Sequence, residues 1–262
     1  MPSNKRERQR AAREARREAE AAAFRRAKAR KRIFRLAILA VLGLVAAYAV
    51  YNTTKPEATD VATGTSTTTD AGSEPEYGSG ECPPVEGAAE RTGTFPDRPP
   101  KCIEEGKKYT ATFTTDAGEF TAELAADKAP LTVNNFVFLA RHKFYDGVPF
   151  HRVIPGFVVQ GGGGEKGDPA GDPGYKIRDE LPGAGEYEIG SLAMANSSRP
   201  HTGGSQFFVV TGEQGVQLPP SYSLFGKVIE GMDVVKKIEA DGTPGGKPAT
   251  VHKTIKVTIT ES

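Results

Sequence analysis

The sequence is poor in cysteine and histidine, and this limits the chemistry that it can support. It contains two cysteines and four histidines in 262 residues. The cysteines do not form a C-x-x-C pair, which excludes a structural zinc site and a thioredoxin-type motif. His142, His151, His201 and His252 lack metal-ligand spacing, and no G-x-S-x-G sequence frames Ser205 as a nucleophile. We therefore expect no metal, no cofactor and no acyl-transfer chemistry.

Two glycine-rich stretches also lack what phosphate binding requires. Residues 162–167 match G-x-G-x-x-G, but Asp168 and Pro169 follow where a helix would have to begin. Residues 242–247 (GTPGGK) are too short for a phosphate-binding loop, and Pro248 stands where a magnesium-binding Ser or Thr is needed. We predict that residues 242–247 form an ordinary loop.

Long apolar runs are scarce, with one exception near the N-terminus. Residues 1–35 hold 14 Lys and Arg against 4 Glu, a net charge of +10, whereas the whole chain carries +1. The next residues, from Leu36 to Tyr51, are uncharged, and counting from Ile33 the run is about 28 Å long as a helix, enough to cross a bilayer. The pattern predicts a basic helical segment over 1–32 and a transmembrane helix over 33–51.

The charge asymmetry predicts the orientation of this span. The positive-inside rule places the N-terminus in the cytoplasm and the rest of the chain outside, as a single-pass protein of the cell membrane. The basic residues 5–35 then lie against anionic lipid, and the adjacent span argues against nucleic-acid binding. A cleaved signal peptide is the alternative, because Ala47 to Ala49 has the small-x-small form of a cleavage site; the long basic region favours an uncleaved signal-anchor.

Residues 52–81 are rich in Thr, Ser, Gly, Pro and acidic residues, and this composition predicts a disordered linker. A proline-rich segment, 82–106, follows, in which Cys82 and Cys102 lie on the expected outer side of the membrane. Thiols tend to oxidise there, so we expect a disulfide between them. Two free thiols are the alternative.

The remaining residues, 107–262, alternate polar and apolar side chains over short segments bounded by Gly, Pro and Asp, which is typical of β-strands. The predicted strands are 107–115, 119–125, 148–154, 157–160, 190–195, 206–211, 223–229 and 252–260. A helical pattern opens at Pro130 and a second amphipathic helix is predicted over 233–240. Many antiparallel strands with two helices predict a mainly β fold, a closed barrel.

Two segments of this domain carry a more specific signal. They are FHRVIPGFVVQGG, residues 150–162, and LAMAN with GSQFFV, residues 192–196 and 204–209. Through them the sequence resembles the cyclophilin family of peptidyl-prolyl isomerases, and the likeness extends over about residues 107–260. The anchor, linker and cysteine pair resemble more loosely the membrane-attached cyclophilins of actinobacterial type. The resemblance implies a closed eight-stranded antiparallel barrel with two capping helices, acting without a cofactor as a monomeric catalytic domain.

The resemblance also implies a set of site residues. Arg152 and Gln160 match the catalytic positions. Contacts with the peptide are implied for His151, Phe157, Val158, Ala195, Asn196, Gln206, Phe208, Leu218 and Tyr222. An arginine suits the reaction because its guanidinium is always charged and offers a rigid fork of donors toward the proline nitrogen.

The implied function is cis-trans isomerisation of X-Pro bonds in unfolded or secreted polypeptides, in support of extracytoplasmic folding. The alternative is a membrane-bound module or chaperone that binds proline peptides without turning them over. Gln217 stands where many cyclophilins have a tryptophan, and Tyr222 where they have a histidine. The first departure implies weak cyclosporin binding.

Overall fold

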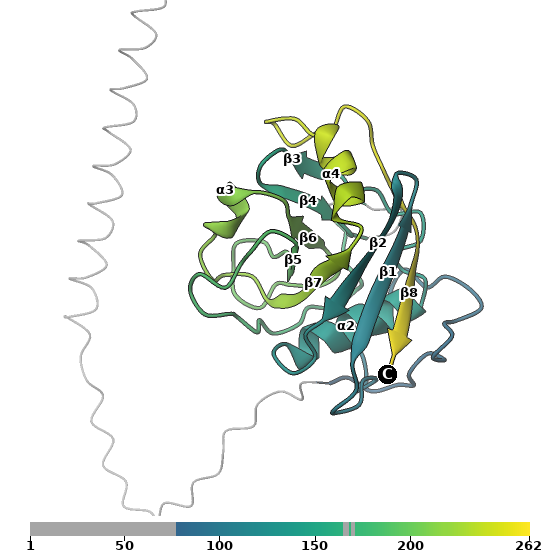
Figure 1. The fold of residues 1–262 in the computed structure, drawn as a ribbon. Coiled ribbons are helices and arrows are strands. Elements are labelled where there is room, and N and C mark those ends of the chain that lie inside the picture. The colour runs from purple at the N-terminus through teal and green to yellow at the C-terminus, as the bar shows by residue number, and fades with distance from the viewer. Residues whose placement is uncertain (1–76, 165–167, 169–170) are drawn as a thin grey trace, which may run out of the picture. The chain divides into compact units, whose positions relative to one another are not determined.

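A computed structural model describes residues 77–164, 168 and 171–262 (Figure 1). The predicted basic segment, the transmembrane helix and nearly all of the linker lie outside the described residues. No helix within the described residues is both long enough and apolar enough to cross a membrane.

The described chain forms a mainly β domain with one eight-stranded sheet. Its strands are β1 (Tyr109–Thr115), β2 (Gly118–Leu124), β3 (Arg152–Ile154), β4 (Val158–Gly161), β5 (Ser191–Met194), β6 (Phe207–Val210), β7 (Leu224–Glu230) and β8 (Thr254–Glu261). They are hydrogen-bonded in the order β3-β4-β6-β5-β7-β2-β1-β8, and every pairing is antiparallel. The alternating segments of the sequence therefore predicted the strands correctly, to within a few residues at their ends.

The sheet curves into a half-barrel whose strand order ends at β3 and at β8. The segments beside these two strands are joined by a bridge between Pro149 and Lys253 and by backbone hydrogen bonds from Gly147 to Thr254, from Thr254 to Val148 and from Phe150 to His252. Complete closure of the barrel stays a prediction. The predicted strand 148–154 is shorter in the structure, where β3 covers only Arg152–Ile154.

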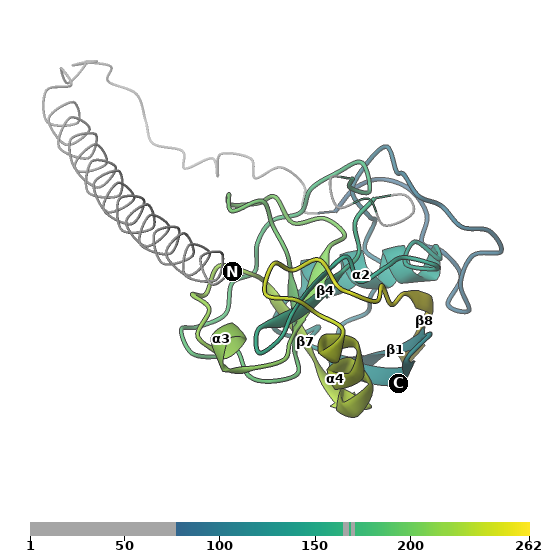
Figure 2. The same ribbon diagram turned by 90° about the horizontal axis from the view of Figure 1, so that it is seen from above.

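Two longer helices lie at opposite ends of the half-barrel, as Figures 1 and 2 show. Helix α2 (Pro130–Arg141) begins with proline at its first position, where the missing N–H costs nothing. The Glu180 carboxylate caps this helix, accepting hydrogen bonds from the backbone N–H groups of Leu131 and Thr132 at 3.0 and 2.8 Å. Helix α4 (Met232–Ala240) matches the second predicted helix, whereas the short α3 (Glu213–Val216) was not predicted.

The core is aromatic and fills the space between the sheet and α2. The rings of Phe113 and Phe120 stack with their centroids 4.5 Å apart, which joins β1 to β2. Phe136 from α2 meets Phe207 of β6 edge to face at 5.8 Å. Burying such side chains contributes roughly 1.5–3 kcal/mol each to the stability of the fold. The sheet that carries the site is therefore stabilised by a well-packed core.

Residues 77–106, which we call the strap, run outside the sheet and pack against α2. A disulfide joins Cys82 and Cys102, as expected from the sequence. The Asn134 side chain of α2 holds the end of the strap, accepting hydrogen bonds from the N–H groups of Cys102 and Ile103 at 2.6 and 3.1 Å. Phe95 is buried further back along the strap. The segment predicted as a proline-rich piece is thus part of the folded domain.

Candidate active site

The site is built on the short hairpin of β3 and β4. Arg152 and Gln160 are paired across these strands, and the burial of β3 alternates so that Val153 faces the core while Arg152 lies on the other face. Arg152 Nη1 donates a hydrogen bond to Gln160 Oε1 at 3.1 Å. The two residues that the sequence pointed to as catalytic are therefore in direct contact.

A further contact extends this pair into a chain of three side chains. Gln160 Nε2 donates to Gln206 Oε1 at 3.0 Å, so Gln160 links Arg152 to the start of β6. The Arg152 guanidinium carbon also lies 5.5 Å from the centre of the Phe157 ring, within range of a cation–π interaction. The guanidinium is therefore oriented by contacts with Gln160 and Phe157. It is half-buried and lies at the edge of a cavity.

That cavity has a volume of about 270 Å³ and collects most of the predicted site residues. It is lined by Arg152, Phe157, Val158, Gln160, Ala195, Asn196, Phe208, Leu218 and Tyr222. Its lining combines Phe, Val, Ala, Leu and Tyr side chains with the polar guanidinium and two amides. A small apolar ring would fit against the walls with its polar neighbours facing these groups. His151 and Gln206 are not among the lining residues.

The wall of the cavity is supported by Tyr187, which was not predicted from the sequence. Phe208 and Tyr222 meet edge to face with their ring centroids 5.3 Å apart. Behind them the Tyr187 hydroxyl donates to the Tyr222 carbonyl at 2.7 Å and accepts from the Tyr222 N–H at 3.1 Å. Tyr187 lies in a segment without regular strand or helix, so no periodicity marked it.

Asn196 lines the cavity, and its side chain is also bonded within the chain. Its predicted contact with a peptide stays a prediction. Its side-chain Nδ2 donates to the Ser221 carbonyl at 2.8 Å, and its Oδ1 accepts from the Ser198 N–H at 3.0 Å. The side chain therefore ties the loop before Tyr222 to the end of β5, which helps to shape one rim of the cavity.

His151 is positioned behind the site as a neutral group. Burial lowers the pKa of its imidazole, an effect that a hydrogen bond with Gln206 partly opposes. Its Nδ1 is buried and has no hydrogen-bond partner among the described residues. This setting suits packing and support better than proton donation.

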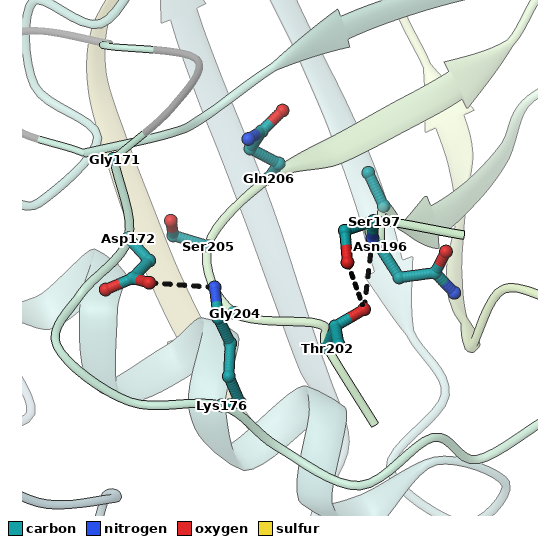
Figure 3. Close-up of a pocket in the computed structure, with 10 residues that line it drawn as sticks. Gly171, Asp172, Lys176, Asn196, Ser197, Thr202, Gly204, Ser205 and Gln206 are labelled. Atoms are coloured by element: carbon teal, nitrogen blue, oxygen red, sulfur yellow. Dashed lines mark hydrogen bonds and ion pairs between the residues drawn. The ribbon is translucent and has the colours of Figure 1, made fainter. Parts of the chain in front are cut away.

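A second cavity, of about 390 Å³, adjoins the first and shares Ala195 and Asn196 with it. Figure 3 shows that its lining is polar, with Lys176 and Asp172 paired at 2.9 Å on one side and Ser197 bonded to Thr202 on the other. A peptide lying across the shared wall would place one side chain in each cavity. Ala195, Asn196 and Gln206 of this lining were predicted from the sequence as peptide contacts, whereas its other residues were not. No cluster of three or more His, Cys, Asp or Glu side chains among the described residues is suited to a metal ion.

Comparison with known proteins agrees with this geometry. Residues 110–261 match the family model described as cyclophilin type peptidyl-prolyl cis-trans isomerase/CLD. Because this match covers more than half of the chain, the protein belongs to the cyclophilin-type peptidyl-prolyl cis-trans isomerase family.

Individual relatives cover the same region. The Bacillus subtilis peptidyl-prolyl cis-trans isomerase B is 43% identical over 137 residues, which span 48% of this chain and 94% of that protein. The Cryptococcus neoformans peptidyl-prolyl cis-trans isomerase-like 2 is 44% identical over 161 residues, but these cover 57% of this chain and only 27% of the relative. A crystal structure of a Cryptosporidium parvum cyclophilin in the presence of the dipeptide Ala-Pro has a TM-score of 0.53 and 30% identity, covering 58% of this chain and 98% of that one.

Proposed function

We propose that the chain accelerates the cis-trans isomerisation of X-Pro bonds in polypeptides. The observation that carries this proposal is the Arg152 guanidinium, hydrogen-bonded to Gln160 at the edge of a cavity that is also lined by Phe157, Phe208 and Leu218. The names of the relatives support it, as does the dipeptide in the Cryptosporidium crystals.

The chemistry required is modest and fits the residues present. The uncatalysed bond rotates over a barrier of about 18–20 kcal/mol because the amide nitrogen shares its lone pair with the carbonyl. Rotation leaves that nitrogen pyramidal and its lone pair free to accept a hydrogen bond. Phe157, Phe208 and Leu218 would hold the ring while the Arg152 fork donates to the nitrogen, an interaction stronger in the transition state than in the ground state.

The setting of the domain is part of the proposal. We infer a single-pass protein with residues 1–32 in the cytoplasm, a span over 33–51, a linker over 52–81 and the isomerase domain outside the membrane. The uncharged run after ten net positive charges supports this arrangement, and so does a disulfide, which is favoured in oxidising compartments. Its substrates would be secreted chains whose X-Pro bonds otherwise take tens to hundreds of seconds to isomerise.

The activity is tested with the full chain in detergent micelles and a peptide containing Ala-Pro, by a protease-coupled assay that cleaves only the trans form. Acceleration of the slow phase supports the proposal. Binding of the peptide without acceleration would identify a binding module instead. Protease digestion of right-side-out and inverted membrane vesicles tests the topology, because the basic segment should be cleaved only in inverted ones.

A further inference from the structure

Arg152 lies on a strand at the end of the sheet, and another segment covers the free edge of that strand. β3 is a terminal strand of the sheet order, bonded to β4 on one side only. On its other side, Val153 donates its N–H to the Gly246 carbonyl at 2.8 Å and accepts from the Thr243 N–H at 3.1 Å. Residues 241–250, which we call the edge loop, therefore continue the hydrogen bonding beyond the sheet.

The edge loop also contacts the Arg152 side chain. A Cβ atom at Gly246 would stand 3.2 Å from Arg152 Cγ and 3.7 Å from Arg152 Nε. Gly246 has a φ of +86°, which favours glycine, and a side chain here would crowd the Arg152 stem. The edge loop thus lies beside the arginine stem.

One histidine, His252, links the edge loop to the turn between β1 and β2. His252 Nε2 lies 2.8 Å from Asp241 Oδ2, at the start of the edge loop, and its Nδ1 lies 3.1 Å from Asp116 Oδ1, in the turn between β1 and β2. Its backbone carbonyl accepts a hydrogen bond from the Phe150 N–H at 2.9 Å, two residues before Arg152. The imidazole is 12% exposed.

Other groups around the imidazole add to the same junction. The Asp116 carboxylate also accepts from the Lys253 N–H at 3.1 Å. The hydrogen bond with His252 is the main reason that the pKa of the Asp241 carboxyl is lowered, and Lys237 of α4 contributes. Lys237 itself donates to the Ala117 carbonyl at 3.2 Å. An imidazolium can donate to both carboxylates at once, whereas most other side chains of this size cannot.

We propose that His252 is a positioning residue for the isomerase reaction: by bridging Asp116 and Asp241 it holds the edge loop against β3 and so fixes the Arg152 guanidinium at the cavity. This inference rests on the proposed function of Arg152. His252 does not line the candidate active-site cavity, so we expect it to affect the rate of the chemical step and not peptide binding.

The test uses the full chain in micelles and compares His252→Asn with a matched control, His201→Asn. His201 is an exposed histidine whose partner is Asp179 in a different loop, and its φ of 59° is one that asparagine tolerates. We expect His252→Asn to lower kcat about tenfold with KM nearly unchanged, because small misplacements of a reacting group are costly. His201→Asn should match the wild type. An unchanged kcat in His252→Asn, or an equal fall in the control, would overturn the inference.

Two further measurements separate positioning from general destabilisation. Asp241→Ala keeps His252 and removes one end of the bridge; the double variant His252→Asn/Asp241→Ala should be no slower than the worse single variant, whereas additive losses would count against a shared bridge. The Nε–Hε NMR signal of Arg152, assigned by its absence in Arg152→Lys, should shift in His252→Asn and stay in place in His201→Asn. A wild type without isomerase activity would refute the proposed function, while an unmoved Arg152 signal would refute the positioning role alone.

Discussion

Phe95 of the strap packs edge to face against His142 at the end of α2, with the ring centroids 5.0 Å apart. Phe138 completes the cluster, 4.9 Å from Phe95 and 4.5 Å from His142. Within the described part of the chain, His142 Nδ1 is buried without a hydrogen-bond partner. The strap is thus held to the helix by a histidine in an apolar setting.

Burial lowers the pKa of His142 below its ordinary value of 6.5, so acid should destabilise the domain. The unfolded chain protonates this histidine at a higher pH than the folded one does. The contribution of neutral His142 to the free energy of unfolding is therefore complete above the pKa of the unfolded chain. It is lost as the pH decreases from that pKa to the lower pKa of the folded chain. We expect the melting temperature to drop between pH 8 and pH 5, measured by circular dichroism.

The variant His142→Phe should reduce this acid sensitivity, because phenylalanine fills the apolar site without titrating. Some dependence should remain, since burial also lowers the pKa of His151. Parallel curves of melting temperature against pH for wild type and variant would assign the acid effect to other groups.

Loss of the Cys82–Cys102 bond should weaken the folded domain without impairing the site. The bond closes a loop with a sequence separation of 20, for which chain entropy predicts about 3 kcal/mol of stability. No strap residue lines the candidate active site. Urea unfolding should therefore detect the loss in Cys82→Ser/Cys102→Ser, while isomerase activity of the folded protein stays near that of the wild type. Dithiothreitol should destabilise the wild type and leave the variant unaffected; equal sensitivity in both would exclude the bond as the cause.

Replacement of Arg152 tests the central feature of the site. Arg152→Ala removes the donor to the proline nitrogen and should lower kcat/KM at least tenfold, about 1.4 kcal/mol of barrier. The melting temperature should hardly change, because this side chain is only half-buried and outside the main core. Activity close to that of the wild type would contradict the mechanism.

Gln217 should determine the response to cyclosporin. It is exposed at the end of α3 and directly precedes Leu218, which lines the cavity. Cyclophilins that bind cyclosporin tightly carry tryptophan at the corresponding position, and a loss of about 60 Å² of apolar contact corresponds to about 1.5 kcal/mol, or roughly tenfold in affinity. We expect inhibition at least tenfold weaker than in Trp-bearing relatives, with much of the difference recovered in Gln217→Trp. An unchanged inhibition constant in Gln217→Trp would place residue 217 away from the bound macrocycle.

Local pattern was enough to predict most of the elements in the described domain. Strand β1 alternates because one of its faces is buried, and this alternation is visible in the order of its residues. Helix α2 was recognisable from Pro130 and its apolar face. The motif around Arg152 similarly marked β3 and β4, since its residues are close in the chain. The disulfide was predictable because only two cysteines are present.

The contacts between distant, aperiodic segments were decided by the tertiary structure alone. Tyr187 supports Tyr222, and Gly246 reaches Arg152, although nothing in their local sequence distinguishes them from ordinary loop residues. The conformational freedom of a glycine, a single hydroxyl group and a histidine between two aspartates produce no periodic pattern in the sequence. Such groups acquire their partners only when the fold brings distant segments together, because long-range packing, and not local burial, selects those contacts.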